Sequence, residues 1–191
     1  MIRTALESVL SELKEHFQIA LGSEEEWVVE GNMATFEGAD GGNAKLNNKI
    51  VCSIVNIEEE KVLKNGLTYS VRNDVTQYHN PTIYLNLYIL FTSTKTDNYL
   101  GGLADLSRVL TFFQGKNVFD QANSQGLPPE IEKIIFDIHT LNFEYLNHLW
   151  GILGGKYYPS VLYKVRLVPI KADAGTLASV ITGIETKESK V

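Results

Sequence analysis

The chain has 191 residues, of which 44% are apolar and 21% charged, and its formal charge is −6. This length and composition predict a single folded domain and argue against a disordered or fibrous chain. The acidic balance disfavours nucleic acid as the main partner, because binding phosphates requires clustered Lys and Arg.

Cys52 is the only cysteine, which excludes an intramolecular disulfide and a multi-thiolate zinc site. Charged residues recur from Arg3 onward, so the N-terminus lacks the apolar run of a secretory signal. The longest apolar stretches, such as residues 83–91, fall far short of the roughly 20 residues that a membrane-spanning helix needs. We therefore expect a cytoplasmic protein without a membrane span.

The first predicted element is an amphipathic helix. Apolar residues recur every three or four positions from Ile2 to Phe17, and polar residues occupy the opposite side. Gly22 lies just beyond the apolar positions and is a natural stop signal. We expect the apolar stripe to pack on the domain's own sheet.

The next segments contain a short and a long strand candidate. Residues 27–29 are the short one, and the glycines within residues 38–42 predict a loop. Residues 50–57 are rich in β-branched side chains and end at the acidic run of residues 58–60. This pattern predicts a strand with both faces partly covered.

A polar segment separates this strand from the next. Residues 61–80 carry turn dipeptides such as Asn65-Gly66, which favours a mobile excursion or a long hairpin loop over packed structure. From residue 83 every second side chain is apolar, up to Phe91, and shares one face, whereas Tyr84, Asn86, Tyr88 and Thr92 lie opposite; this period of two predicts a strand.

A second helix is predicted after this strand. Asp97 can cap a helix whose apolar positions run over residues 100–113, with Gly115 past its end. The paired glycines Gly101 and Gly102 weaken the prediction for its first turn.

The following region predicts a strand and a short helix. Residues 131–141 alternate as in a strand, with a helix running from Glu130 as the alternative. Asn142 is a suitable N-cap for a short helix that Gly154-Gly155 closes.

The last predicted strand follows Pro159 and has one apolar and one charged face. Its apolar positions are Val161, Tyr163, Val165 and Leu167, and its charged positions are Lys164 and Arg166. Residues 171–191 are rich in small and polar residues, which predicts an extension that becomes ordered by contact with a partner.

This order of elements predicts an α+β fold: a mixed or largely antiparallel β-sheet with three or four helices packed against it. We place the single domain at residues 1–170 and the C-terminal extension at residues 171–191.

The sequence shows no metal-binding or phosphate-binding motif. Glu144 and His148 share a helix face and His139 is nearby, but an ordinary surface ion pair explains them better than a metal site. Lys156 follows two glycines, yet Trp150 stands where a phosphate loop needs its first glycine.

No nucleophile is evident either. Ser160 lacks the glycines of a nucleophile elbow, and Cys52 lies within an apolar strand, where a free cysteine acts as a small hydrophobe. We therefore expect a protein that is not an enzyme and needs no cofactor.

Aromatic side chains are the more informative feature. The chain has nine tyrosines and two tryptophans, and several tyrosines fall in or beside predicted strands. Tyrosine combines a large apolar face with one hydrogen bond, which suits protein interfaces. Ordinary sheet packing is the commoner explanation for any single one of them.

Several segments resemble a known family. They are NPTIYLNLYILF at residues 80–91, LTFFQ at 110–114 with NVF at 117–119, and LWGILGGKYYPSVLYKVR at 149–166. With the opening helix, these segments resemble the N-terminal domain of the cap proteins of phage-tail-like contractile injection systems, of the virulence-cassette and antifeeding-prophage type. The resemblance covers residues 1–170 in order, least well at residues 23–48. It rests on hydrophobic patterns with a few fixed polar residues.

The resemblance implies a phage tail-terminator-like fold and a structural role. Such a cap forms an oligomeric ring, hexameric like the tube, which sits on the last layer of the inner tube and contacts the last sheath layer. It stops tube growth and starts or stabilises sheath polymerisation. The implied partners are further copies of the chain, the tube protein and the sheath protein. The implied location is a phage-tail-like particle that is assembled in the cytoplasm and released from the cell.

Many family members carry a further C-terminal region beyond the shared domain. Two alternatives follow for the sheath contacts: this chain makes all of them alone, or it shares them with paralogues. The expected partner-binding residues are Tyr157, Tyr158, Tyr163, Lys164 and Arg166. The basic pair suits an acidic tube or sheath surface, where such charges mainly set orientation and association rate.

Two alternative functions remain open. The first is another phage-tail-like completion or terminator component at a different junction. The second, which is less favoured, is a small hydrolase or ligand-binding domain that uses Ser160, His148 and Glu144.

Overall fold

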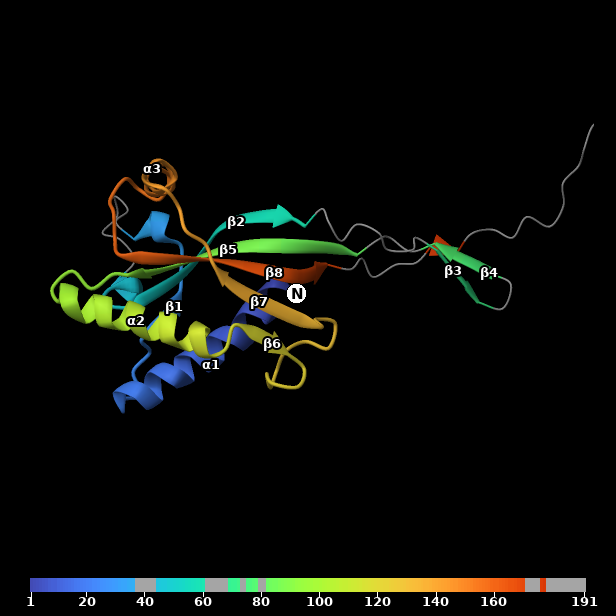
Figure 1. Cartoon of the computed structure of the whole chain (residues 1–191), viewed down its shortest axis with the longest axis horizontal. Coiled ribbons are helices and arrows are strands. Elements are labelled where there is room, and N and C mark those ends of the chain that lie inside the picture. The colour runs from blue at the N-terminus through green and yellow to red at the C-terminus, as the bar shows by residue number, and fades with distance from the viewer. Residues whose placement is uncertain (37–43, 61–68, 73–74, 79–81, 171–175, 178–191) are drawn as a thin grey trace, which may run out of the picture.

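The computed structural model describes residues 1–36, 44–60, 69–72, 75–78, 82–170 and 176–177 (Figure 1). Three α-helices and nine strands are found among them. They are α1 (Ile2–Leu21), β1 (Val28–Glu30), β2 (Ile50–Glu59), β3 (Tyr69–Arg72), β4 (Val75–Tyr78), β5 (Ile83–Ser93), α2 (Tyr99–Gly115), β6 (Val118–Asp120), β7 (Lys133–Ile138), α3 (Phe143–Ile152), β8 (Ser160–Ile170) and β9 (Thr176–Leu177). Two short 3₁₀-helices, η1 (Met33–Thr35) and η2 (Ala44–Leu46), lie between β1 and β2.

Six strands form the main sheet in the order β1-β2-β5-β8-β7-β6. Strand β1 runs parallel to β2, and every other neighbouring pair is antiparallel. The sheet is therefore mixed, and the predicted α+β class with a mixed sheet is confirmed.

Helices cover both faces of this sheet. Figure 1 shows α1 and α2 on one side of the sheet and α3 on the other. The larger buried cluster lies under α1 and α2 and includes Phe17 and Phe113, whereas the smaller one surrounds Trp150 of α3. Consecutive residues of a central strand belong to different clusters, because successive side chains of a strand point to opposite faces of the sheet. In β5, Ile89 belongs to the larger cluster and Leu90 to the smaller.

Helix α1 confirms the first prediction. Its predicted apolar face is buried on the sheet, with Leu13 and Phe17 fully covered. Gly22 ends the helix in the left-handed conformation, with φ of 61°, and donates its backbone N–H to the carbonyl of Gln18. A side chain is disfavoured in this conformation, which explains the glycine.

Helix α2 begins one residue later than predicted, because Asn98 and not Asp97 is the N-cap. The Asn98 side chain accepts a hydrogen bond of 2.9 Å from the backbone N–H of Gly101. The two glycines do not break the first turn. A Cβ at Gly101 would lie 2.6 Å from the cap amide of Asn98, and a Cβ at Gly102 would lie 2.5 Å from Ser93 Oγ. The glycines therefore allow the cap and the sheet to approach the helix closely.

The region after α2 contains one expected and one unexpected strand. Residues 133–138 form strand β7, so the alternative of a helix from Glu130 is wrong. Strand β6 was not predicted, since three residues are too few to show an alternation. Helix α3 starts at the predicted cap, where Asn142 Oδ1 accepts from the N–H of Tyr145 at 2.9 Å.

The polar segment between β2 and β5 contains strands β3 and β4, which pair as an antiparallel hairpin. The prediction of a loop in place of packed structure is therefore wrong for the residues of these two strands. Strand β9 adds to β4 through Gln77–Leu177 and Tyr78–Thr176, which makes a second, three-stranded sheet. The loop predicted at residues 38–42 and most of the extension at residues 171–191 lie outside the described residues.

Candidate interaction surfaces

An aromatic cluster fills the space between α2 and the centre of the sheet. The ring of Phe113 stacks on Phe136 with 4.5 Å between centroids and lies 4.7 Å from the ring of Tyr163. Phe91 and Phe119 close the cluster at 5.5 and 6.3 Å from Phe113. Side chains from segments far apart in the sequence are thereby packed together beneath α2.

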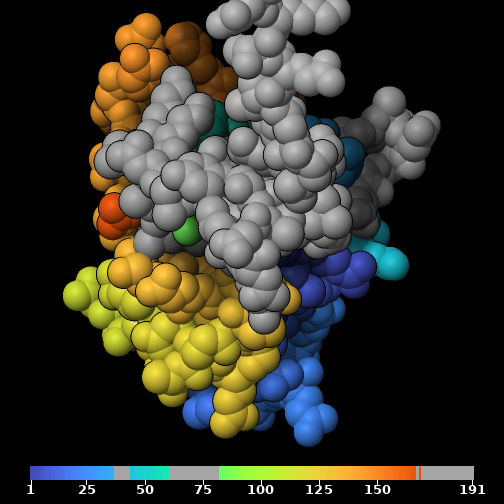
Figure 2. Space-filling view, turned by 90° about the vertical axis from the view of Figure 1, so that its right-hand side faces the viewer, coloured from blue at the N-terminus to red at the C-terminus, as the bar shows by residue number. Residues whose placement is uncertain are grey.

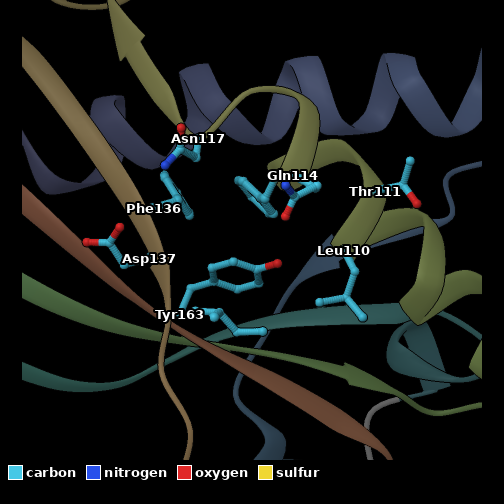
Figure 3. Close-up of a pocket in the computed structure, with 9 residues that line it drawn as sticks. Leu110, Thr111, Gln114, Asn117, Phe136, Asp137 and Tyr163 are labelled. Atoms are coloured by element: carbon cyan, nitrogen blue, oxygen red, sulfur yellow. The ribbon is translucent and has the colours of Figure 1, made fainter.

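A groove of about 570 Å³ opens beside this cluster, between the C-terminal half of α2 and strand β7 (Figure 3). Its floor is aromatic and its walls carry polar groups. The lining residues are Leu110, Thr111, Phe113, Gln114, Asn117, Phe136, Asp137, Ile138 and Tyr163. Figure 2 views another side of the molecule and shows the yellow-to-gold region around β6 and β7 next to the blue helix α1.

Tyr163, one of the predicted partner-binding residues, lies on the floor of this groove. Its side chain is 3% exposed and packs within the aromatic cluster, while Figure 3 shows its hydroxyl directed toward α2. Burial raises the pKa of Tyr163 to about 12, because an ionised phenolate is poorly solvated there. A partner would reach this residue only by entering the groove.

Lys164 and Arg166 lie on the opposite face of the sheet, as the alternation in β8 predicted. Arg166 forms an ion pair of 2.6 Å with Asp137 of β7. Asp137 is also the cross-strand neighbour of Lys164. The expected basic stripe is therefore a patch of mixed charge, since an acidic side chain lies within it.

Tyr88 of β5 extends this patch. The Nζ atom of Lys164 lies 5.9 Å from the centre of the Tyr88 ring, and His139 packs edge-on to the same ring at 5.2 Å. The Tyr88 hydroxyl donates to Glu58 at 3.0 Å. Burial, together with the hydrogen bond to Glu58, raises the pKa of Tyr88.

Tyr157 and Tyr158 form a third location, beside the end of α3. Their rings pack against Trp150 at 5.7 and 5.8 Å between centroids, and Tyr158 also contacts Phe36. Tyr157 is 61% exposed. The five predicted residues thus occupy three separate places: the α2 groove, the mixed-charge patch and the end of α3.

The sequence-based search missed the outer face of α2. The residues that face away from the sheet are Leu100, Leu103, Ala104, Ser107, Leu110, Thr111 and Gln114. None is charged, and Leu100, Leu103 and Leu110 are 77%, 36% and 38% exposed. We call this surface the α2 outer face. The available signal was that leucines occur on both sides of the predicted helix, which is typical of a helix covered all round.

The described residues offer little for catalysis or metal binding. No three His, Cys, Asp or Glu side chains among them lie close enough to share a metal ion. Cys52 is buried in the core, where burial raises the pKa of its thiol and disfavours the reactive thiolate. Among these residues no hydrogen bond joins Ser160, His148 and Glu144; the His148 ring instead packs edge-on to Tyr145. No described helix has the length and apolar character needed to cross a bilayer.

Comparison with models of known protein families identifies the family of this chain. The model of the Pvc16 N-terminal domain matches residues 2–182. The chain belongs to this family. The family match covers the main sheet and all three helices, and it confirms the resemblance seen in the sequence. A search of curated protein sequences finds no match.

Two solved structures share the fold of this family member. One is the sheath/tube terminator of an extracellular contractile injection system, PVC, in the extended state, with a TM-score of 0.54 and 13% identity over 93% of this chain. The other is the tube-terminating cap of the anti-feeding prophage, with a TM-score of 0.52 and 15% identity over 73% of this chain. The matched regions make up 62% and 49% of those two chains.

Proposed function

We propose that this chain is a structural cap of a contractile injection system, which forms a ring on the last layer of the inner tube and contacts the last sheath layer. The observation that carries the proposal is the shared fold with a sheath/tube terminator over 93% of the chain, together with membership of the family. In this role the protein acts by binding and not by catalysis. The ring is hexameric, to match the tube, and the finished particle is released from the cell.

Ring formation depends on contacts between surfaces that a single subunit leaves uncovered. A subunit with two different binding surfaces joins identical neighbours head to tail. The assembly closes into a ring when the rotation between neighbouring subunits divides a full turn. A closed ring has no free subunit surface with which to grow sideways. Such a ring on the end of the tube blocks the addition of another tube layer.

The test is to image particles made with and without this chain. Capped tubes of uniform length are expected from the complete set of proteins. Loss of the chain should give tubes or sheaths of variable length, with no density for a cap at the tube end. Particles of unchanged length and unchanged ends would contradict the proposal. Density for this chain at another junction would favour a different completion component.

The mixed-charge patch is our proposal for the attachment to tube or sheath. Reversing Lys164 and Arg166 together, as Lys164→Glu/Arg166→Glu, should slow attachment to purified tube ends, because rim charges mainly set orientation and association rate. Arg3→Glu/Lys45→Glu makes the same change in net charge at two exposed positions outside β7 and β8 and serves as the control. Equal effects of both variants in a surface-binding assay would assign the change to overall charge and contradict a specific role.

We also propose that residues 171–191 are an extension ordered by a partner. A chain truncated after residue 177 keeps strand β9 and should fold normally while attaching more weakly to tube or sheath. Attachment equal to that of the complete chain would remove this extension from the contact.

A further inference from the structure

Strand β2 has an open edge along its second half. Strand β1 pairs with β2 over residues 50–52 only. The chain leaves this edge at Gly31, whose N–H donates to the carbonyl of Cys52 at 3.1 Å and whose carbonyl accepts from the Ser53 hydroxyl at 2.5 Å. No described residue continues the ladder past Gly31, and Figure 1 shows the end of β2 extending beyond β1. Residues 54–59 therefore pair with a neighbouring strand, β5, on one side only.

Hydrogen bonds identify the backbone groups that this edge leaves open. The N–H of Glu60 donates to a carbonyl of β5 at 2.7 Å, so Glu60 and Glu58 face β5. Ile57 and Glu59 face outward, because backbone groups alternate in direction along a strand. The outward N–H of Ile57 donates at 2.9 Å to the side-chain oxygen of the adjacent Asn56. That amide oxygen is a local substitute for the carbonyl of a neighbouring strand.

A β-bulge places two isoleucines of this edge on the same face. The pairing with β5 shifts between Ile54 and Asn56, so β2 contains one extra residue there. Ile54 lies opposite Ile89. Ile57 lies opposite Leu87, and both of these β5 residues belong to the larger buried cluster under α1 and α2. The two isoleucines therefore face the α1 side of the sheet, where they are 38% and 49% exposed.

An apolar groove of about 740 Å³ runs beside this edge, between β2 and α1. Its apolar lining comes from Ile2 and Leu6 of α1 and from Ile54. A strand added along β2 would direct every second side chain to the α1 side, because side chains alternate between the two faces of a sheet. The groove provides space for those side chains.

The open edge is acidic. Residues 58–60 are three consecutive glutamates at the end of β2 and just after it. The cations that line the groove, Arg3 and Lys14, form ion pairs with Glu7 and Glu30 of the same groove at 2.8 and 3.0 Å. Two edges of this kind repel each other, which disfavours pairing with the same strand of a second copy. A strand that carries Lys or Arg gains favourable contacts instead.

We propose that residues 54–59 of β2 bind an extended, basic segment of another protein, which adds a strand to the main sheet. The backbone of that segment completes the ladder at the outward groups of β2. Its alternate apolar side chains enter the groove over Leu6 and Ile54, and its Lys or Arg side chains lie on the other face, toward Glu58. In strand addition, main-chain hydrogen bonds give affinity and spaces for alternate side chains give specificity. The inference goes beyond the proposed function, because it assigns a peptide-binding site to the isolated chain.

Fluorescence anisotropy on the full-length chain tests the binding. The probe is a fluorescein-labelled heptapeptide in which lysine and valine alternate, so that its extended form has one basic and one apolar face. The same peptide with glutamate in place of lysine is the comparison. The basic peptide should bind at least about tenfold more tightly than the acidic one, because like charges in a contact are costly. Equal affinities, or no binding of the basic peptide, would overturn the inference.

The variant Ile57→Pro tests the addition of a strand. Proline lacks the outward N–H of this position and leaves the hydrogen bonds to β5 in place. Ile57→Ala shortens the side chain but keeps the N–H, so it is the matched control. Ile57→Pro should weaken binding of the basic peptide about tenfold more than Ile57→Ala does, which is the effect of one lost hydrogen bond. Equal losses would show that the peptide does not bind this backbone group and would overturn the inference.

The double variant Glu58→Lys/Glu59→Lys tests the charge. It should bind the basic peptide at least about tenfold more weakly than the wild type does, and the acidic peptide more tightly. Glu24→Lys/Glu132→Lys makes the same change in net charge at exposed positions outside β2 and is the matched control. Equal weakening by both double variants would assign the binding to overall charge and overturn the inference.

Circular dichroism and thermal unfolding check that every variant folds. If Ile57→Pro is unfolded, Ile54→Glu replaces it, because a carboxylate at this position makes the apolar groove unfavourable for apolar side chains. Ile19→Glu is then the control, since Ile19 is 76% exposed on α1 and does not line the groove. Equal affinities of these two variants for the basic peptide would overturn the inference.

Hydrogen exchange on the wild-type chain separates this occupant from others. The amide of Ile57 should exchange more slowly when the basic peptide is bound, because it becomes part of a ladder. Protection confined to other segments would overturn the inference. A peptide of residues 178–191 that displaces the basic peptide at a lower concentration would also overturn it, in favour of this chain's own segment. Self-association that Ile57→Pro abolishes would overturn it in favour of a second copy. None of these measurements involves tube ends, so the inference and the cap function can fail independently.

Discussion

Single polar side chains determine where helices α2 and α3 begin, and the hydroxyl of Tyr163 affects how stability depends on pH. Asn98 and Asn142 each accept one backbone hydrogen bond at the start of a helix. Such a bond satisfies one of the N–H groups that the first helical turn leaves free. Tyr163 is different, because its hydroxyl lies at the floor of a groove and its ring lies in the core.

Replacing Asn98 with Ala should lower the free energy of unfolding by about 1 kcal/mol, because the cap of α2 is lost. Asn98→Asp keeps an acceptor at the same position and should cost much less. Urea unfolding followed by circular dichroism measures both. Equal losses for the two variants would show that the hydrogen bond to Gly101 contributes little.

The stability of the protein should fall as the pH rises from about 10 to 12, in part through Tyr163. The buried phenol has a pKa of about 12, above the value of an exposed tyrosine, so the unfolded chain releases this proton first. The contribution is complete below the unfolded pKa and is lost as the pH rises through the folded one, with a slope of at most about 1.4 kcal/mol per pH unit. Tyr163→Phe should make the urea midpoint less dependent on pH in this range, whereas an unchanged pH profile would contradict this assignment.

At the scale of elements, polar and aromatic contacts join segments that are distant in sequence. Lys116, just after α2, donates to Glu12 of α1 at 2.6 Å and to the carbonyl of Asn123 at 2.5 Å. Its Nζ also lies 4.8 Å from the Phe119 ring. This one side chain therefore ties α1, α2 and the turn after β6 together.

The substitution Lys116→Met should lower the free energy of unfolding by about 1–2 kcal/mol, because the partly buried carboxylate of Glu12 loses its cation. Glu12 Oε1 already has no hydrogen-bond partner among the described residues, which makes the remaining charge costly. Lys116→Met/Glu12→Gln should recover part of the loss, since no uncompensated charge is left. Additive losses in the double-mutant cycle would mean that the two side chains do not interact.

The aromatic cluster should be the most sensitive part of the core. Phe113→Ala is expected to cost about 3–5 kcal/mol, because a central ring leaves a cavity among neighbours from four elements. Phe112 is adjacent in sequence but only partly buried, so Phe112→Ala is the matched control and should cost less. Thermal unfolding would contradict the central position of Phe113 if the two losses were equal.

At the scale of the whole molecule, attachment to tube or sheath should respond to salt. The proposed contact uses the charges around Lys164 and Arg166. Raising the salt from about 0.05 to 0.5 M shortens the range of charge interactions severalfold. The rate of attachment to tube ends should then fall. An attachment rate that does not change with salt would contradict a contact made through these charges.

The amino-acid sequence by itself determined most of the elements and the family. Hydrophobic periodicity is a local property, so it located α1, β2, β5, α3 and β8, and the order of these patterns was enough for the resemblance that the family match confirms. The strands β3, β4 and β6 were missed because each is too short for a clear alternation. Only the tertiary structure decided which apolar residues stay exposed. Leucines on both sides of α2 look alike in sequence, and the sheet covers one side of a helix, so the α2 outer face became visible only once α2 was packed.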